Sequence, residues 1–221
     1  MLSRDQARAF YDRFGAKQDQ QRFYEDPATR DLLRHADFAE AQAVFEFGCG
    51  TGRFAAELFA EHLPPAAQYV GCDVSETMIG LARQRLVPYG SRAEVRHTDG
   101  SPRVDSPDQT FDRFVSNYVL DLLSPEDIRL VLAEAYRVLT ADGCLCLVSL
   151  THGPTAVSGC VSWVWSRVHR FRPALVGGCR PIELVDFLDD RSWKVEYRNV
   201  IVAVGIPSEV VVARKRQYAA R

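Results

Sequence analysis

The chain has 221 residues, of which 47% are hydrophobic, which suits one α/β domain with a small addition and excludes a chain too polar to form a core. Its 27 basic and 29 acidic side chains leave a net charge of −2, so the overall charge does not indicate a nucleic-acid partner. Residues 1–6 are polar and no apolar run approaches the roughly 18 residues of a membrane-spanning helix, so we expect a cytoplasmic protein.

Residues 1–40 are expected to be helical and carry several aromatic side chains among charged and amide groups: Phe10, Tyr11, Phe14, Phe23 and Tyr24. The most specific pattern comes next, after a predicted strand at residues 43–47. It is the run Glu46-Phe47-Gly48-Cys49-Gly50-Thr51-Gly52, followed by a helical apolar face that ends before Pro64-Pro65. Because glycine has no Cβ, such a turn brings backbone N–H groups close to a ligand. The pattern predicts a nucleotide-like cofactor.

Further strands are predicted at residues 68–72, 94–98, 111–117 and 144–150, with helical segments between most of them. The clearest helix covers residues 125–139, where Ser124 can cap the start and Pro125 suits the first helical position. A last helix at residues 182–188 precedes strands at 194–204 and 209–213, joined by a tight turn. The order predicts a doubly wound, Rossmann-like α/β fold with seven strands, mostly parallel, and a C-terminal antiparallel hairpin.

This order of elements, with the glycine turn first and the hairpin last, resembles the class I S-adenosylmethionine-dependent methyltransferases over about residues 40–215. The resemblance implies S-adenosyl-L-methionine as cofactor and S-adenosyl-L-homocysteine as product. It also implies a cofactor site made of these residues: Glu46, Gly48, Cys49, Gly50, Gly52, Asp73, Val74, Met78, Asp99, Gly100 and Asn117. Asp73 would accept the ribose hydroxyls, Asp99 the adenine amino group, and Asn117 would lie near the methionine end.

Each of three assignments has a structural alternative. Asp73, two residues before Ser75, also fits a helix cap, and Asp99 before Gly100 also fits an ordinary turn. Met78 also fits plain core packing, because methionine fills gaps readily.

The methyl acceptor is less well defined. His152, just past the fifth strand, is the candidate base, although it also fits an exposed loop histidine. Candidate substrate-binding residues are Tyr11, Tyr24, Tyr118, Asp121 and Arg180. In related enzymes a segment like residues 1–40 is often a lid over the cofactor, but it equally fits a helix covering the sheet edge.

We expect a single domain over residues 1–221, divided into an N-terminal helical lid (1–40), a cofactor-binding core (41–150), an inserted helical acceptor or cap region (151–180) and a last helix with the closing hairpin (181–221). Within the insertion, residues 155–172 combine an apolar helical stripe with a basic opposite side. This helix fits an acceptor pocket, ordinary packing, or contact with an anionic membrane surface.

Several patterns are absent from the sequence. The fourth strand ends Ser-Asn-Tyr-Val and not in the Asn/Asp-Pro-Pro-aromatic run of base-modifying enzymes, and the six cysteines show no zinc spacing, so we assign no metal and no nucleic-acid partner. Cys144 and Cys146 should point to one face of a strand as small buried groups.

From the resemblance and these absences we expect methyl transfer to a small molecule. The alternatives are a lipid or quinone acceptor at a membrane, a non-catalytic S-adenosylmethionine-binding module, and a nicotinamide-dependent oxidoreductase. The sequence does not fix the acceptor atom or the oligomeric state.

Overall fold

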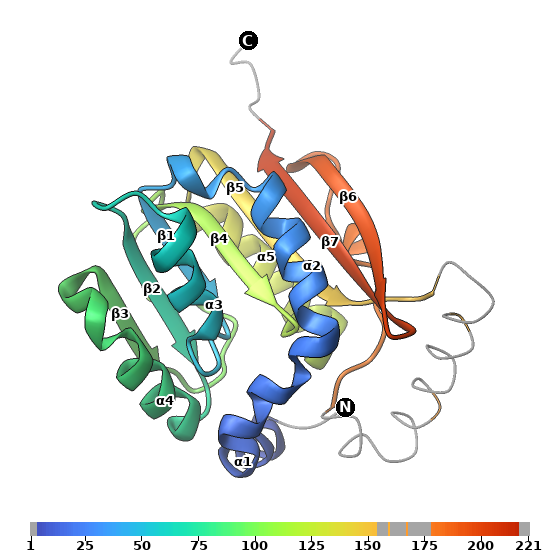
Figure 1. The fold of residues 1–221 in the computed structure, drawn as a ribbon. Helices are drawn as coiled ribbons and strands as arrows, with labels where there is room; N and C mark the ends of the chain where they lie inside the picture. Colours follow the sequence, from blue (N-terminus) through green and yellow to red (C-terminus); the bar gives the residue numbers. More distant parts are fainter. Residues whose placement is uncertain (1–3, 154–158, 160–166, 168–177, 217–221) are drawn as a thin grey trace.

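The computed structural model describes residues 4–153, 159, 167 and 178–216. Within these residues, seven strands form one sheet in the order β3-β2-β1-β4-β5-β7-β6 (Figure 1). The strands are β1 Ala43–Phe47, β2 Gln68–Asp73, β3 Ala93–His97, β4 Phe111–Asn117, β5 Leu139–Leu150, β6 Trp193–Ala203 and β7 Ile206–Lys215. Neighbours from β3 to β5 pair in parallel, whereas β7 pairs antiparallel with β5 and β6. The predicted Rossmann-like sheet with its antiparallel hairpin is confirmed.

Helices cover both faces of the sheet (Figure 1). They are α1 Arg4–Phe14, α2 Arg22–His35, α3 Arg53–Glu57, α4 Glu76–Leu86 and α5 Pro125–Val138. Short helical turns are η1 Gly15–Gln21, η2 Phe38–Glu40, η3 Leu58–His62, η4 Val87–Arg92, η5 Leu120–Leu122 and η7 Leu184–Phe187. Side chains of α2, α3 and α4 share one core cluster, and those of α5 share the other.

Alternation along β5 divides its side chains between these two clusters. Cys144 and Cys146 are fully buried on the α2 side, while Leu145 and Leu147 are buried on the α5 side. The expectation that the two cysteines share a face is therefore confirmed, and it follows from the two-residue period of a strand.

Helix starts follow the capping signals in the sequence. The Ser124 hydroxyl accepts a hydrogen bond from the N–H of Asp127 at 3.0 Å, and Pro125 begins α5. Leu139, expected in this helix, instead begins β5 and pairs with Phe111. The helix thus ends one residue earlier than predicted.

The predicted helix at residues 182–188 is wrong. Only the short turn η7 forms, because the backbone before it and at its first residue is held by long-range hydrogen bonds. The N–H of Ile182 donates to the Leu150 carbonyl at 2.9 Å, and the N–H of Leu184 donates to the buried carboxylate of Glu209. Since these bonds tie the segment to β5 and β7, tertiary structure overrides the local helical preference.

Candidate functional site

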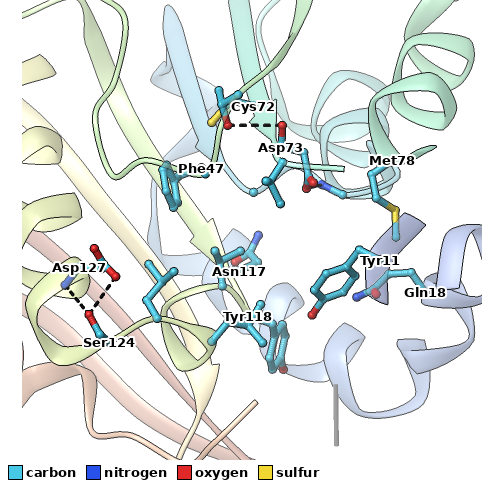
Figure 2. Close-up of a pocket in the computed structure, with 18 residues that line it drawn as sticks. Tyr11, Gln18, Phe47, Cys72, Asp73, Met78, Asn117, Tyr118, Ser124 and Asp127 are labelled. Carbon is cyan, nitrogen blue, oxygen red and sulfur yellow. Dashed lines mark hydrogen bonds between the residues drawn. The ribbon is translucent and has the colours of Figure 1, made fainter. Parts of the chain in front are cut away.

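A cavity of about 310 Å³ opens at the carboxyl ends of β1, β2 and β4 (Figure 2). This is the edge where open α/β sheets bind ligands. Residues of five regions line it: the end of β1 with the turn after it, the ends of β2 and β3, the start of α4, the segment from β4 to the start of α5, and the N-terminal segment. The lining residues are Tyr11, Gln18, Phe47, Gly48, Gly50, Cys72, Asp73, Val74, Met78, Thr98, Gly100, Asn117, Tyr118, Val119, Leu122, Leu123, Ser124 and Asp127.

The glycine turn brings bare backbone to the cavity. Gly48 has φ +80°, and a Cβ there would lie 2.3 Å from Cγ2 of Val119. Gly52 has φ +71°, and its Cβ would lie 3.0 Å from the Cα of Ala82 in α4. Gly50 also has positive φ but has open space around it and lines the cavity. Glycine is therefore required at Gly48 and Gly52 for close packing, and Gly50 offers its backbone to a ligand.

Asp73 stands at the end of β2 and lines the cavity. Its carboxylate accepts hydrogen bonds from the N–H groups of Gly50 and Ser75, each at 2.9 Å. Burial raises the pKa of Asp73, and these two bonds oppose the rise. The cap of α4 is Ser75, whose hydroxyl accepts from the N–H of Met78 at 3.2 Å. Asp73 thus links the glycine turn to the loop after β2.

Beyond Asp73 the cavity is lined by Val74, Met78, Thr98 and Gly100. Met78 is fully buried in α4 and also faces the cavity. Asp99 is exposed, is not among the described lining residues, and accepts a hydrogen bond from the N–H of Ser101 at 2.8 Å. The carboxylate of Asp99 therefore forms a local turn, and backbone of Gly100 lines the cavity in its place.

Asn117 lies at the centre of the cavity (Figure 2). Both atoms of its amide group are buried, and neither makes a well-formed hydrogen bond to a described residue. Glu46 is buried beneath the turn and accepts a hydrogen bond from the Tyr69 hydroxyl at 2.6 Å. Burial raises the pKa of Glu46 to about 8, although Tyr69 and the nearby Asn117 amide favour its charged form. Glu46, Cys49 and Gly52 support the turn without lining the cavity.

The N-terminal segment is joined to both loops of this cradle. The Ser75 hydroxyl donates to Asp12 of α1 at 2.6 Å. In η1, Asp19 accepts from the Thr51 hydroxyl at 2.7 Å and from Arg85 at 2.6 Å. These bonds hold Tyr11 and Gln18 against the cavity (Figure 2). Sequence reasoning missed Asp12, Gln18, Asp19 and Tyr69, because contacts between residues far apart in the chain leave no local pattern.

Some of the predicted acceptor residues line the cavity and others lie behind its wall. Tyr118 lines the cavity, has φ +56°, and donates its hydroxyl to Ser208 at 2.9 Å. Tyr24 is buried behind it, with the two rings edge to face at 5.7 Å. Positive φ is strained for a bulky residue, and here it turns the chain so that Asn117 and Val119 both face the cavity.

Asp121, Arg180 and His152 are not among the described residues that line the cavity. Asp121 is fully buried and accepts from the N–H of Leu150 at 3.2 Å; burial raises its pKa to about 7. Arg180 turns inward and donates to the Leu123 carbonyl at 2.6 Å. His152 is exposed. The structure thus brings Tyr11 and Tyr118 to the cavity and leaves these three outside it.

Apart from Gly159 and Arg167, the predicted helix at residues 155–172 lies outside the described residues. Within the described ranges, no group of three or more His, Cys, Asp or Glu side chains is arranged to hold a metal ion. In the same ranges, no helix has both the length and the apolar character needed to cross a membrane.

Comparison with known proteins identifies a methyltransferase domain within the chain. Residues 44–143 match the family model described as a methyltransferase domain. A malonyl-[acyl-carrier protein] O-methyltransferase of Laribacter hongkongensis is 33% identical over 153 residues, covering 66% of this chain and 48% of the relative. A ubiquinone/menaquinone biosynthesis C-methyltransferase of Saccharophagus degradans is 28% identical over 115 residues, covering 52% and 45%. The chain thus spans about half the length of these curated relatives. A solved SAM-dependent methyltransferase from Methanosarcina mazei superposes with a TM-score of 0.67 at 19% identity, covering 84% of this chain and 98% of that chain.

Residues 44–143 thus form a methyltransferase domain, and the fold with the curated relatives supports a class I S-adenosylmethionine-dependent methyltransferase with S-adenosylmethionine as cofactor. The cavity fits this group, since the cradle at Gly48 admits no Cβ and the buried amide of Asn117 has unused hydrogen-bonding capacity. The domain match also decides against a nicotinamide-dependent oxidoreductase.

Proposed function

We propose that the chain transfers a methyl group from S-adenosylmethionine to a small-molecule acceptor that enters beside Tyr11 and Tyr118. The observation that carries the proposal is the character of the cavity wall. Among the described lining residues none is Lys or Arg, and half have apolar or aromatic side chains. A nucleic-acid substrate requires basic side chains for its phosphates, whereas small-molecule pockets are mostly apolar with a few polar groups.

In this proposal, Gly48 and Gly50 present backbone to the methionine end of the cofactor and Asp73 accepts the ribose hydroxyls. Val74, Met78 and Gly100 surround the adenine, and Asn117 faces the methionine end. When bound, the cofactor supplies a methyl group made electrophilic by the positive sulfur. The protein's own part is to align the acceptor with that methyl and to exclude water.

The tyrosines at the acceptor end are positioning groups and not bases. Burial raises the pKa of Tyr11 and of Tyr118 well above the usual value, and the Tyr118 hydroxyl is already bonded to Ser208. Asp121 has a pKa of about 7 but lies behind the cavity wall. The proposed transfer therefore depends chiefly on alignment, which favours acceptors that arrive already deprotonated, such as carboxylates.

A panel of acceptors tests this proposal. The protein is incubated with S-adenosylmethionine labelled in the methyl group and with small organic acids, thioester-linked acids, phenols, quinols, RNA or protein. We expect label in a small molecule, with carboxylic acids as the first class to examine, because a relative is named as a malonyl-[acyl-carrier protein] O-methyltransferase. Label only in RNA or protein would overturn the small-molecule proposal. Cofactor binding without transfer to any acceptor would favour the non-catalytic alternative.

A quinone acceptor at a membrane is the second candidate, supported by the relative named as a ubiquinone/menaquinone C-methyltransferase. The quinol arm of the panel is therefore run with and without anionic vesicles. Vesicle binding that falls when Trp163 and Trp165 are replaced would support this candidate, and equal transfer without vesicles would count against it.

A further inference from the structure

Tyr69 and Glu46 form a buried pair beneath the glycine turn. Tyr69 is 1% exposed and Glu46 is 2% exposed, and the Tyr69 hydroxyl donates to Oε2 of Glu46 at 2.6 Å. Tyr69 does not line the cavity. Its hydroxyl nevertheless reaches the Glu46 carboxyl on the neighbouring strand β1, directly below the glycine turn, and that turn does line the cavity. A buried charged group needs such a partner.

Gly71 makes this bond possible. It lies opposite Glu46 in the parallel pairing of β1 with β2, two residues after Tyr69 on the same face. A Cβ at Gly71 would lie 2.5 Å from the Tyr69 hydroxyl oxygen and 2.8 Å from the Cβ of Cys49. The missing side chain therefore leaves the space through which the tyrosine reaches the carboxyl.

The surroundings of Glu46 leave its charge open to change. Asp73 of β2 disfavours its carboxylate, whereas Arg53 of α3, Asn117 of β4 and Tyr69 favour it, and Cys49 of the turn adds a neutral thiol. Burial outweighs the favourable groups, so the pKa is about 8 and the carboxyl is mostly protonated at neutral pH without ligand. A cation placed in the adjacent cavity favours the charged form.

We infer that Tyr69 is a positioning residue for cofactor binding: it holds the Glu46 carboxyl beneath the glycine turn and stabilises it as a carboxylate when the cationic methionine end of the cofactor arrives. This inference rests on the cofactor assignment. The Glu46 carboxyl loses one proton to solvent, while Tyr69 keeps its own and continues to donate. Cofactor binding is therefore linked to proton release.

The experiment is isothermal titration of the intact protein with S-adenosylhomocysteine, which keeps the α-ammonium group, in two buffers of different ionisation enthalpy between about pH 6.5 and 8.5. Because the ligand-free pKa is about 8, the wild type should release ~0.9 proton from Glu46 at pH 7. Glu46→Gln should lose this release, and subtracting its signal removes any protons that come from the ligand.

Tyr69→Phe should bind about tenfold more weakly at pH 7, since each unit of added pKa in Glu46 costs a factor of ten. The deficit should shrink as the pH rises, because Glu46 then ionises without the hydroxyl. Tyr89→Phe is the matched control. Like Tyr69, Tyr89 packs against Phe59 and does not line the cavity, but its hydroxyl donates to the Ala56 carbonyl at 3.1 Å and not to Glu46. It should bind like the wild type at every pH.

A deficit for Tyr69→Phe that is equal at all pH values would overturn the inference, because it would indicate a structural role alone. Equal proton release by the wild type and Glu46→Gln would overturn it as well, and this comparison holds even if Tyr69→Phe fails to fold. No binding by the wild type would instead contradict the cofactor assignment itself, so the two failures are distinguishable.

Discussion

Gly48 has no side chain, and this lets a ligand approach the turn after β1 closely. Alanine there would have to adopt φ +80° and would place its Cβ 2.3 Å from Val119, a side chain that lines the cavity. We expect Gly48→Ala to weaken S-adenosylhomocysteine binding about 100-fold by titration calorimetry and to cost roughly 2 kcal/mol of stability, a fall in Tm of about 4–8 °C.

Gly80→Ala is the matched control for this substitution. Gly80 lies within α4, and nothing approaches within 4 Å of the Cβ position. Alanine there should leave affinity unchanged and stabilise the helix by about 0.5–1 kcal/mol. Normal affinity in Gly48→Ala would contradict the cradle proposed for the turn.

For single residues, the sequence predicted the site residues that directly follow strands. It missed those whose contacts join segments far apart in the chain. Gly48, Gly50 and Asp73 could be placed because a strand end and a glycine spacing are local signals. The sequence predicted Asp99 at the cavity, whereas the next residue, Gly100, lines its wall. An Asp-Gly pair does not reveal whether the aspartate side chain or the glycine backbone faces a ligand. Tyr69 left no signal, because its partner Glu46 is 23 residues away.

Among the elements, η1 of the N-terminal segment makes contacts with the glycine turn and α4 that a single substitution can test. Asp19 of η1 joins Thr51 and Arg85 and is about one quarter exposed. After allowing for solvent screening, we expect Asp19→Asn to cost about 1 kcal/mol of local stability. Tryptic cleavage after the exposed Lys17 should then be about fivefold faster, and S-adenosylhomocysteine should slow it.

Asp5→Asn is the control, because Asp5 is paired with Arg8 on an exposed face of α1. Its cleavage rate should match that of the wild type. If Asp19→Asn were also cleaved at the wild-type rate with and without ligand, η1 would not act as part of a lid over the cavity.

Elements with strong local signals were predicted well. β1 and β4 have the predicted bounds, and α5 begins at the predicted proline. The helix expected at residues 182–188 failed because Glu209, distant in sequence, takes the N–H of Leu184. Within residues 1–40, Tyr11 of α1 lines the cavity, and the lid stays a prediction, while α2 packs on the sheet, where Asp31 accepts from the Tyr197 hydroxyl at 2.8 Å.

For the whole molecule, buried carboxyl groups predict how stability depends on pH. Burial raises the pKa of Glu46 to about 8 and that of Asp121 to about 7, both above their values in an unfolded chain. Groups of this kind stabilise the fold at low pH, and the benefit is lost as pH rises through the folded pKa. The ligand-free protein should therefore have a Tm lower at pH 8.5 than at pH 6, by on the order of 5 °C.

Partly exposed ion pairs have the opposite pH dependence, which falls outside the range from pH 6 to pH 8.5. Hydrogen bonds from Arg96 and Arg137 lower the pKa of Glu94 and of Glu134, so those groups lose their contribution only in acid. Thermal unfolding at the two pH values is the measurement, and Glu46→Gln should reduce the difference. A Tm that rises from pH 6 to pH 8.5 would contradict this prediction.

The fold as a whole was the most predictable level, because the alternation of strands and helices, the position of the glycine turn and the closing hairpin each have a sequence pattern. The acceptor side was the least predictable. Its predicted residues are divided between the cavity wall, where Tyr118 lies, and the positions behind or outside it that Asp121, Arg180 and His152 occupy.

The most direct test of the cofactor site is a crystal structure of the protein with S-adenosylhomocysteine. We predict the ribose hydroxyls within hydrogen-bonding distance of Asp73, the adenine beside Met78 and Gly100, and the amino-acid end against Gly48 and Asn117. A ligand bound elsewhere, or one placed in this cavity with its ribose away from Asp73, would contradict the account.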